Sequence, residues 1–297
     1  MIRDLNIRPG VIRRLAATTA LLATGAGLAP SASAADVADV DGYQVKLRVD
    51  DVLVDSSGDL TSAALDLFNL SEEDAESGAE VERSLYVDTE DKDFDAAGWS
   101  LRLRHKEGED AYDLTYKYRQ DLADNTLSSD SVDQALTDAA DANFDSSDDN
   151  YEAQVNASYS TSTLDFSNQK STDCPDSSCD LEDDADSGKA VELLDDKLPG
   201  KFEKALGTTL EDADASASQV VTQRTWPVTV DTEDGGIEAD LEVTEMSGGY
   251  FVEVTAETED REDAADVRDA LEAALDEEGF LRQSDAFKTS LVLDGRL

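Results

Sequence analysis

Alternation of apolar and polar side chains dominates the chain and predicts a protein built mainly from β-strands. A strand points successive side chains to opposite faces, so this period of two indicates strands with one buried face and one polar face. Nine stretches show the pattern: Tyr43–Asp50, Val81–Asp88, Trp99–His105, Tyr112–Arg119, Tyr151–Phe166, Val220–Val230, Ile237–Thr244, Tyr250–Thr258 and Lys288–Leu293.

Three other stretches carry apolar residues three and four positions apart, which is the spacing of an amphipathic helix. They run from Leu60 to Phe68, from Val191 to Leu198 and from Ala264 to Leu275, and the second is expected to end at Pro199-Gly200. The Asp/Ser-rich segments 121–150 and 167–188 are expected to be acidic surface insertions or mobile loops. The expected fold class is α+β, mainly β, with a few flanking helices.

The first 34 residues have the features of a bacterial-type signal peptide. Arginines precede an uncharged stretch from Leu15 to Ala29, and Ser31-Ala32-Ser33-Ala34 resembles a cleavage site. A membrane anchor is the alternative, but the stretch is shorter than the roughly 18 apolar residues needed to span a bilayer. We expect cleavage after Ala34 and a secreted or extracytoplasmic domain at residues 35–297. The pair Arg13-Arg14 leaves both the general and the twin-arginine export routes open.

The charge of the chain limits its partners. Seventy Asp and Glu residues face 24 Lys and Arg residues, so the formal net charge is −46. Such a charge repels nucleic acid and anionic membranes, and neither is an expected partner. The well-solvated surface of a secreted or salt-tolerant protein explains this acidity without any specific function.

Cysteine and histidine are scarce. Cys174 and Cys179 would close a short loop in an exported chain, which predicts a structural disulfide rather than a metal site. His105 is the only histidine and has no nucleophile pattern around it. Catalytic triads and His-ligated zinc sites are therefore not expected.

The placement of charges on the predicted strands is more informative. Basic residues alternate on three early strands and acidic residues alternate on two late ones, so each set shares one strand face. Inward-facing, the two sets would line a lumen with a basic wall and an acidic wall, suited to a phosphate chain and a divalent metal. Facing outward, they would be an ordinary wet sheet face with weak cross-strand pairs. The basic set is Lys46, Arg48, Arg102, Arg104, Lys117 and Arg119, and the acidic set is Glu238, Asp240, Glu242, Glu253 and Glu257.

Three runs in the first half of the chain resemble the motifs of the CYTH (triphosphate tunnel) family. Ser84–Asp91 is similar to the family's Y-x-D-T-x-D segment, Ala97–Arg104 to its G-x-x-L-R-x-R strand, and Leu114–Lys117 to its L-T-x-K strand. The order and the spacing of the runs both agree with the family. Looser matches follow at Arg224, at Gly249–Glu253 and at Phe287-Lys288.

This resemblance implies a fold, a ligand and a set of site residues. The fold is an eight-stranded antiparallel tunnel-like β-barrel, and the ligand is a phosphate-chain small molecule held with Mg or Mn. Arginine suits phosphate because its planar fork donates two hydrogen bonds, whereas lysine acts as a mobile point charge. The implied phosphate ligands are Arg102, Arg104, Lys117, Arg224 and Lys288, together with Arg48, which matches the basic end of the family's first-strand motif E-x-E-x-K. The implied metal ligands are Glu253 and, more weakly, Glu242.

Two departures from the family pattern affect the metal. The family's opening E-x-E-x-K reads Gln44-Val45-Lys46-Leu47-Arg48 here, and its late E-x-E reads Glu253-Val254-Thr255. Glu238, Asp240 or Glu257 could replace the lost carboxylates if strand register turns them inward. Two hypotheses therefore stand: an exported, metal-dependent phosphohydrolase of triphosphate or short polyphosphate, and a catalytically degenerate tunnel that binds an anion or serves as an extracellular structural protein.

Overall fold

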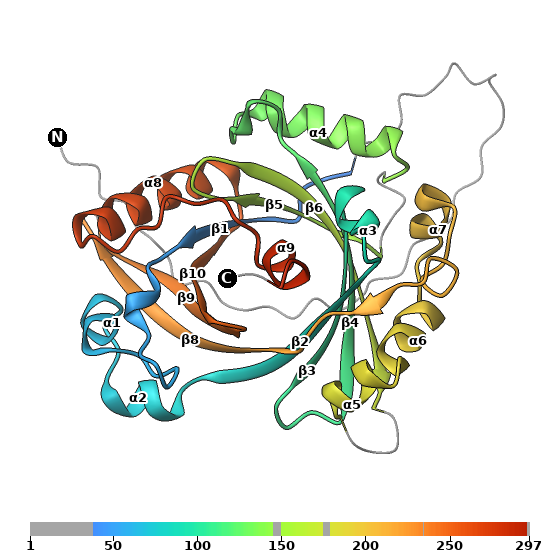
Figure 1. Cartoon of the computed structure of the whole chain (residues 1–297). Helices are drawn as coiled ribbons and strands as arrows, with labels where there is room; N and C mark the ends of the chain where they lie inside the picture. The colour runs from blue at the N-terminus through green and yellow to red at the C-terminus, as the bar shows by residue number, and fades with distance from the viewer. Residues whose placement is uncertain (1–37, 145–149, 175–178, 234, 296–297) are drawn as a thin grey trace, which may run out of the picture. The chain divides into compact units, whose positions relative to one another are not determined.

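The computed structural model describes residues 38–295 except 145–149, 175–178 and 234. Within these residues ten strands form one sheet in the order β3-β4-β6-β5-β1-β10-β9-β8-β2-β7, and a further pairing of β3 with β2 closes nine of them into a ring (Figure 1). The strands are β1 Gly42–Arg48, β2 Glu80–Asp88, β3 Trp99–Lys106, β4 Ala111–Asp121, β5 Glu152–Ala157, β6 Ser162–Asp173, β7 Ser216–Ala217, β8 Val221–Thr232, β9 Gly235–Met246 and β10 Gly249–Thr258.

The predicted α+β, mainly strand architecture is confirmed, and the strand count differs from the expected eight. The expected strand Tyr151–Phe166 is two strands, β5 and β6, joined by a tight turn in which the Ser158 amide donates to the Thr161 carbonyl over 2.9 Å. Eight of the nine ring pairings are antiparallel, whereas β1 and β5 run parallel, with Tyr43 opposite Val155.

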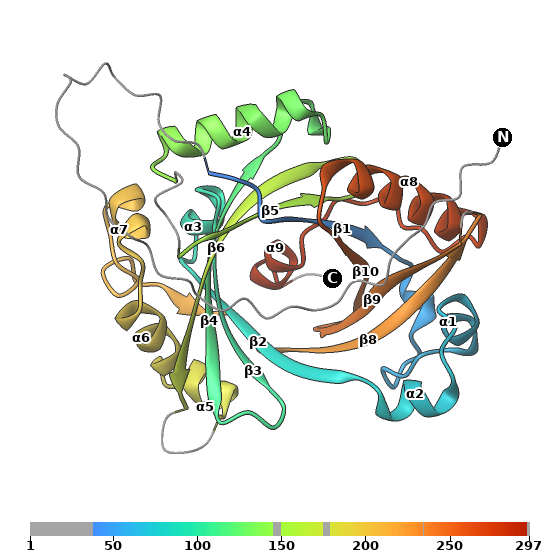
Figure 2. The same cartoon turned by 180° about the vertical axis from the view of Figure 1, so that it is seen from behind.

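Helices flank the ring (Figure 2). The three predicted helical stretches are confirmed in α1, α6 and α8, and α6 ends before Pro199 as expected. Asp260 caps α8 by accepting hydrogen bonds from the amides of Glu262 and Asp263, each over 3.0 Å. The described helices are α1 Ser62–Leu67, α2 Glu72–Ser77, α3 Asp93–Ala96, α4 Ser129–Asp141, α5 Leu181–Asp186, α6 Lys189–Asp196, α7 Gly200–Leu206, α8 Arg261–Glu277 and α9 Lys288–Leu293, with short 3-10 turns at Asp51–Leu53 and Ala123–Asn125.

Parts of the two Asp/Ser-rich segments are regular structure rather than loop. The first contains α4, which buries Val132, Ala135, Leu136 and Ala139 at helical spacing. The second begins inside β6, which continues to Asp173 along the whole length of β4. The helix α4 was not predicted because its buried face is made partly of alanine, which adds little to the average hydrophobicity of a segment so rich in acidic residues.

The disulfide between Cys174 and Cys179 is confirmed, with Cα atoms 5.1 Å apart. None of the helices in the described part of the chain combines the length and the apolar character that a membrane span requires. The predicted signal peptide, residues 1–34, lies outside the described residues.

The main apolar core lies between the outer face of the ring and the helices. On β3, Trp99, Leu101 and Leu103 are buried, and the Trp99 ring meets Phe202 of α7 edge-on with centroids 5.2 Å apart. On β4, the buried Tyr116 hydroxyl donates to the Leu194 carbonyl of α6 over 2.7 Å. The alternate residues of the same strands face the interior of the ring, which is therefore free to be polar.

The C-terminal segment was predicted as a strand, but it forms the helix α9. This helix packs against β2 and buries Val292 against Tyr86, Val221, Phe251 and Met246 in a separate small apolar cluster. The ribbon of α9 lies within the outline of the ring (Figures 1 and 2). Six residues are too few for periodicity to separate a strand from a helix, which explains the wrong prediction.

Candidate functional site

The interior of the ring holds a cavity of about 460 Å³ lined mainly by charged and polar side chains. Eight of the 24 Lys and Arg residues of this very acidic chain line it. They come from four elements that are distant in sequence: β1, β3, β4 and α9. The eight are Lys46, Arg48, Arg102, Arg104, Lys106, Lys117, Arg119 and Lys288.

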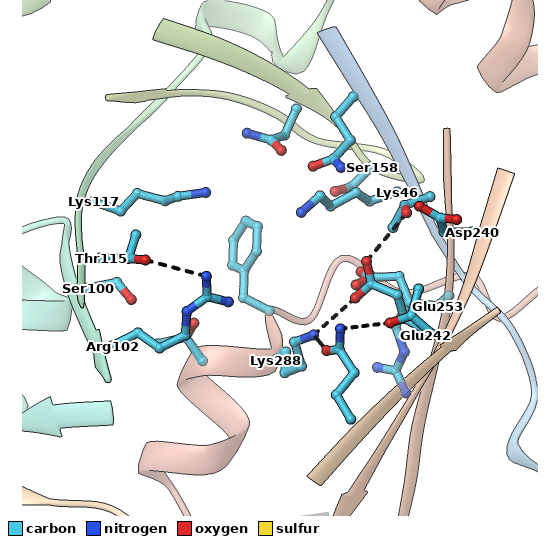
Figure 3. A pocket seen from close by; sticks show the side chains of 18 of the residues that line it. Lys46, Ser100, Arg102, Thr115, Lys117, Ser158, Asp240, Glu242, Glu253 and Lys288 are labelled. Carbon is cyan, nitrogen blue, oxygen red and sulfur yellow. Dashed lines mark hydrogen bonds and ion pairs between the residues drawn. The ribbon is translucent and has the colours of Figure 1, made fainter. Parts of the chain in front are cut away.

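The cavity has two chemically different walls (Figure 3). Strands β3 and β4 supply the larger basic group, whereas β9 and β10 supply carboxylates from across the ring. We call the carboxylate side the acidic wall. Its members are Asp240, Glu242, Glu253 and Glu257.

Three cations in the cavity, Lys46, Arg48 and Arg102, lack a carboxylate partner among the described residues. Among the described residues neither Lys46 nor Arg102 forms an ion pair, and Arg102 only donates to the Thr115 hydroxyl over 3.4 Å. The Nε atom of Arg102 is buried and has no hydrogen-bond partner in the described structure. The side chains of Lys46, Arg102 and Lys117 point into the same space from different strands (Figure 3). Enclosed, unpaired donors of this kind are suited to receive an anion.

A buried carboxylate, Asp165, pairs with two of the basic side chains of β4. Asp165 of β6 is fully buried and contacts Lys117 Nζ at 3.1 Å and Arg119 Nε at 2.9 Å. Burial by itself raises the pKa of Asp165, but the two cations outweigh it and hold the pKa below its usual range. Asp165 therefore stays ionised and fixes both basic side chains in place.

Lys117 is the basic group whose charge is most easily lost. Burial lowers its pKa to about 8, with Lys46 and Arg119 acting in the same direction and Asp165 opposing them. A bound anion would replace the missing counter-charge and raise this pKa again. The site is therefore most receptive to anions below about pH 8.

Besides Lys117, the predicted phosphate ligands Arg104 and Arg48 have protein partners in the cavity, two carboxylates for Arg104 and an aromatic ring for Arg48. Arg104 donates to Glu82 over 3.0 Å and to Asp113 over 2.9 Å, so its charge is compensated. Arg48 lies with its guanidinium 3.8 Å from the centre of the Phe251 ring, and burial lowers its pKa. Both line the cavity, but they are less available to a ligand than Arg102.

The acidic wall is compensated by the C-terminal helix. Glu242 accepts from Lys288 Nζ over 3.1 Å and from the Thr255 hydroxyl over 3.4 Å, and Lys288 also contacts Gln223. Although burial opposes ionisation, Lys288 and Lys46 lower the pKa of Glu242 to about 2. Burial raises the pKa of Glu253, which lies opposite Glu242 in the sheet register.

The implied Mg or Mn site does not fit these side chains. The described part of the chain contains no group of three or more His, Cys, Asp and Glu side chains arranged to hold a metal ion. On β1, the positions facing the acidic wall are Gln44, Lys46 and Arg48, none of which is an anionic ligand. Hard divalent cations prefer several oxygen ligands, and the Glu242 oxygens are already engaged by Lys288 and Thr255.

Two predicted site residues do not line the cavity. Arg224 sits one position out of register: its neighbours Gln223 and Thr225 line the cavity, whereas Arg224 donates to the Gly58 carbonyl over 2.7 Å. Glu238 is exposed and lies two residues before Asp240 on β9. The other predicted residues come together there: Arg48, Arg102, Arg104, Lys117 and Lys288, with Asp240, Glu242, Glu253 and Glu257.

Sequence reasoning did not single out every residue that shapes the site. Alternation placed Lys46 and Arg119 in the predicted basic set, and both line the cavity, although the family resemblance did not imply them as ligands. Asp165 and Gln223 gave no comparable signal, because their roles depend on which strands are neighbours in the ring.

The CYTH domain family model matches residues 60–289. The chain belongs to the CYTH domain family. No curated protein sequence matches this CYTH chain. Its solved structural neighbours include HpAC1 from Hippeastrum, described as having a dominant triphosphatase activity, with 17% identity, a TM-score of 0.46, and coverage of 86% of this chain and 96% of the other. The PH1819 protein from Pyrococcus horikoshii OT3 aligns with 15% identity, a TM-score of 0.42, and coverage of 86% and 100%.

Proposed function

We propose that this CYTH domain binds inorganic triphosphate or a short polyphosphate chain inside the ring. The observation that carries the proposal is the convergence of Lys46, Arg102 and Lys117 on one enclosed space, where Lys46 and Arg102 lack anionic partners within the described structure. Membership of the CYTH family supports triphosphate binding or hydrolysis as the class of function.

A linear phosphate chain suits the distribution of donors better than a single small anion does. Arg102 on β3 and Lys117 on β4 flank Thr115 on one wall, while Lys46 reaches in from β1 (Figure 3). A chain of phosphates carries oxygens along its whole length and can contact all three groups together. The guanidinium offers paired donors to one phosphate, and each ammonium offers a point charge to another.

The enclosed position of these cations supports a small-molecule ligand. Nucleic acid meets proteins through extended basic surfaces, whereas this chain has a formal charge of −46 and collects eight of its bases inside the ring. We therefore propose a free phosphate-chain molecule as the partner and no nucleic acid.

We also propose that the domain acts outside the cytoplasm after cleavage of residues 1–34. The signal-like sequence of these residues and the disulfide between Cys174 and Cys179 support this proposal, because structural disulfides persist mainly in oxidising compartments.

Titration of the full chain with sodium tripolyphosphate by calorimetry, together with melting curves, tests the proposed binding. We expect saturable binding, a higher melting temperature, and an affinity loss of about tenfold to hundredfold in Arg102→Ala, the usual effect of removing a charge-assisted contact. Arg224→Ala is the matched control, because this arginine lies outside the cavity, and its affinity should stay unchanged. Equal loss in both variants, or no binding by the wild type, would overturn the proposal.

Phosphate release measured in the same samples separates binding from hydrolysis. Samples with added Mg or Mn test the metal that the family resemblance implies. Release that persists in Arg102→Ala points to a contaminating phosphatase rather than to this site.

A further inference from the structure

Two carboxylates of the acidic wall, Glu242 and Glu253, have ammonium and guanidinium groups of the protein as neighbours. Lys288 donates to Glu242 over 3.1 Å, and Arg48 lies opposite Glu253 in the register of β1 with β10. Paired buried carboxylates such as Glu242 and Glu253 would repel each other strongly without such cations. The three bases Lys46, Arg48 and Lys288 outnumber this pair, so the pair itself carries no uncompensated negative charge. Asp240 and Glu257, the other members of the acidic wall, are exposed to solvent.

Lys46 occupies the central position of this arrangement. It lies opposite Thr255 in the sheet register, so its diagonal neighbours on β10 are Glu253 and Glu257. Its side chain extends from β1, next to the acidic wall, into the cavity toward Lys117 (Figure 3). A carboxylate at this position could join Glu253 in holding a cation, whereas an ammonium group repels one.

A divalent cation entering here would meet two obstacles. It would have to displace Lys288 from Glu242, and it would then lie close to the charge of Lys46. The same ammonium groups can instead donate hydrogen bonds to phosphate oxygens, which a polyphosphate free of metal presents without competition.

We propose that the cavity selects the metal-free form of the polyphosphate chain, with Lys46 and Lys288 supplying the positive charge that a divalent cation would otherwise bring. This inference rests on the proposed function and deepens it, because it specifies the ionic form of the ligand. Magnesium then acts as an antagonist: it binds the polyphosphate in solution and lowers the concentration of the form that the protein accepts.

Calorimetry of the full chain with tripolyphosphate tests the inference under three conditions. These are buffer with EDTA, buffer with MgCl₂ in excess over tripolyphosphate, and buffer with NaCl at the ionic strength of the magnesium sample. We expect full affinity with EDTA and with NaCl, and an apparent affinity about tenfold lower or weaker still with MgCl₂, from the mass action of chelation. Affinity that is equal or higher with MgCl₂ overturns the inference but leaves the proposed function standing. Absence of binding in all three conditions overturns the proposed function itself.

Substitutions at Lys46 add a readout that does not depend on tripolyphosphate. Lys46→Glu places a carboxylate beside Glu253, and we expect this variant to bind Mn²⁺ alone measurably more tightly than the wild type, as followed by electron paramagnetic resonance. Lys46→Gln keeps the size of the side chain without either charge and should bind tripolyphosphate weakly and Mn²⁺ no better than the wild type does. Melting curves confirm that both variants fold. Tight Mn²⁺ binding by the wild type would contradict the inference.

Discussion

The ammonium group of Lys288 donates to Oε2 of Glu242 over 3.1 Å and thereby joins the C-terminal helix α9 to strand β9 inside the ring. Both side chains are only 17% exposed. Burial lowers the pKa of Lys288, but Glu242 outweighs this effect, so the net pKa is raised above its usual range. The contact therefore holds a charged pair in a poorly solvated place.

Replacing Lys288 by methionine should lower stability, because it leaves a buried carboxylate with a weaker counter-charge. We expect the free energy of unfolding at neutral pH to fall by about 3 kcal/mol. The depressed pKa of Glu242, about 2, contributes stability that is present above the unfolded-state pKa and is lost as the pH falls through about 2. Denaturant melts at neutral and acidic pH should show a smaller acid-dependent loss in Lys288→Met than in the wild type. Equal acid dependence would contradict this assignment.

Arg104 and Arg102 are two residues apart on β3 and should behave differently when they are removed. Arg104→Ala leaves Glu82 and Asp113 without their cationic partner, so the melting temperature should fall while tripolyphosphate affinity changes little. Arg102→Ala leaves no carboxylate without a partner. It should lower tripolyphosphate affinity about tenfold or more, with a smaller effect on the melting temperature. Calorimetry and melting curves of the two variants measure both effects. A reversed pattern would show that Arg104 is the ligand.

The pKa of Lys117 predicts how anion binding depends on pH. This lysine is charged below about pH 8 and neutral above it in the free protein. Tripolyphosphate binding should therefore weaken relative to Lys117→Met as the pH rises from about 7 to about 9.5, because binding must first restore the proton. The ligand's own titration cancels in this ratio of wild-type to variant affinity. A ratio that stays constant with pH would remove Lys117 from the site.

Asp165 supports two cations, so its loss should be costly. Asp165→Asn leaves Lys117 and Arg119 without their buried partner and should lower the free energy of unfolding by about 3–5 kcal/mol. The matched control is Asp113→Asn, because Asp113 is 34% exposed and Arg104 retains Glu82 after the change. Denaturant unfolding distinguishes the two. Similar small losses in both variants would mean that Asp165 is dispensable for the fold.

Cleavage of the predicted signal peptide can be checked directly. When the full gene is expressed in a bacterial host, we expect the exported protein to begin at Ala35. Mass spectrometry of the intact protein and of its N-terminal peptide measures this start. Retention of residues 1–34 in a membrane fraction would support the anchor alternative instead.

Alternation along the strands was enough to predict several of the residues that line the cavity, because a period of two assigns each side chain to one face of its strand. Arg102 and Lys117 could be predicted in this way, since outward-facing Trp99, Leu101 and Tyr116 leave their neighbours facing inward. Arg224 was implied only by the family resemblance: its strand was predicted, but its neighbours Gln223 and Thr225 line the cavity while Arg224 contacts the Gly58 carbonyl.

Other features depend on long-range contacts that sequence periodicity does not contain. The parallel pairing of β1 with β5 brings together segments about a hundred residues apart, and the sequence of neither segment indicates which strand it pairs with. Helix α9 forms where a strand was predicted, because Val292 finds an apolar cluster assembled from several other strands. Likewise, Asp165 becomes a partner of Lys117 only through the pairing of β4 with β6.

The separation of an internal basic cluster from an acidic exterior has a kinetic consequence. A polyanion diffusing toward the protein meets repulsion from a chain of charge −46 well before it reaches the eight enclosed cations. Salt screens that long-range repulsion, with a Debye length of about 10 Å at 0.1 M, more than it weakens contacts made inside the ring. Encounter should therefore quicken as salt is added to dilute buffer, the reverse of the usual slowing seen when oppositely charged partners meet.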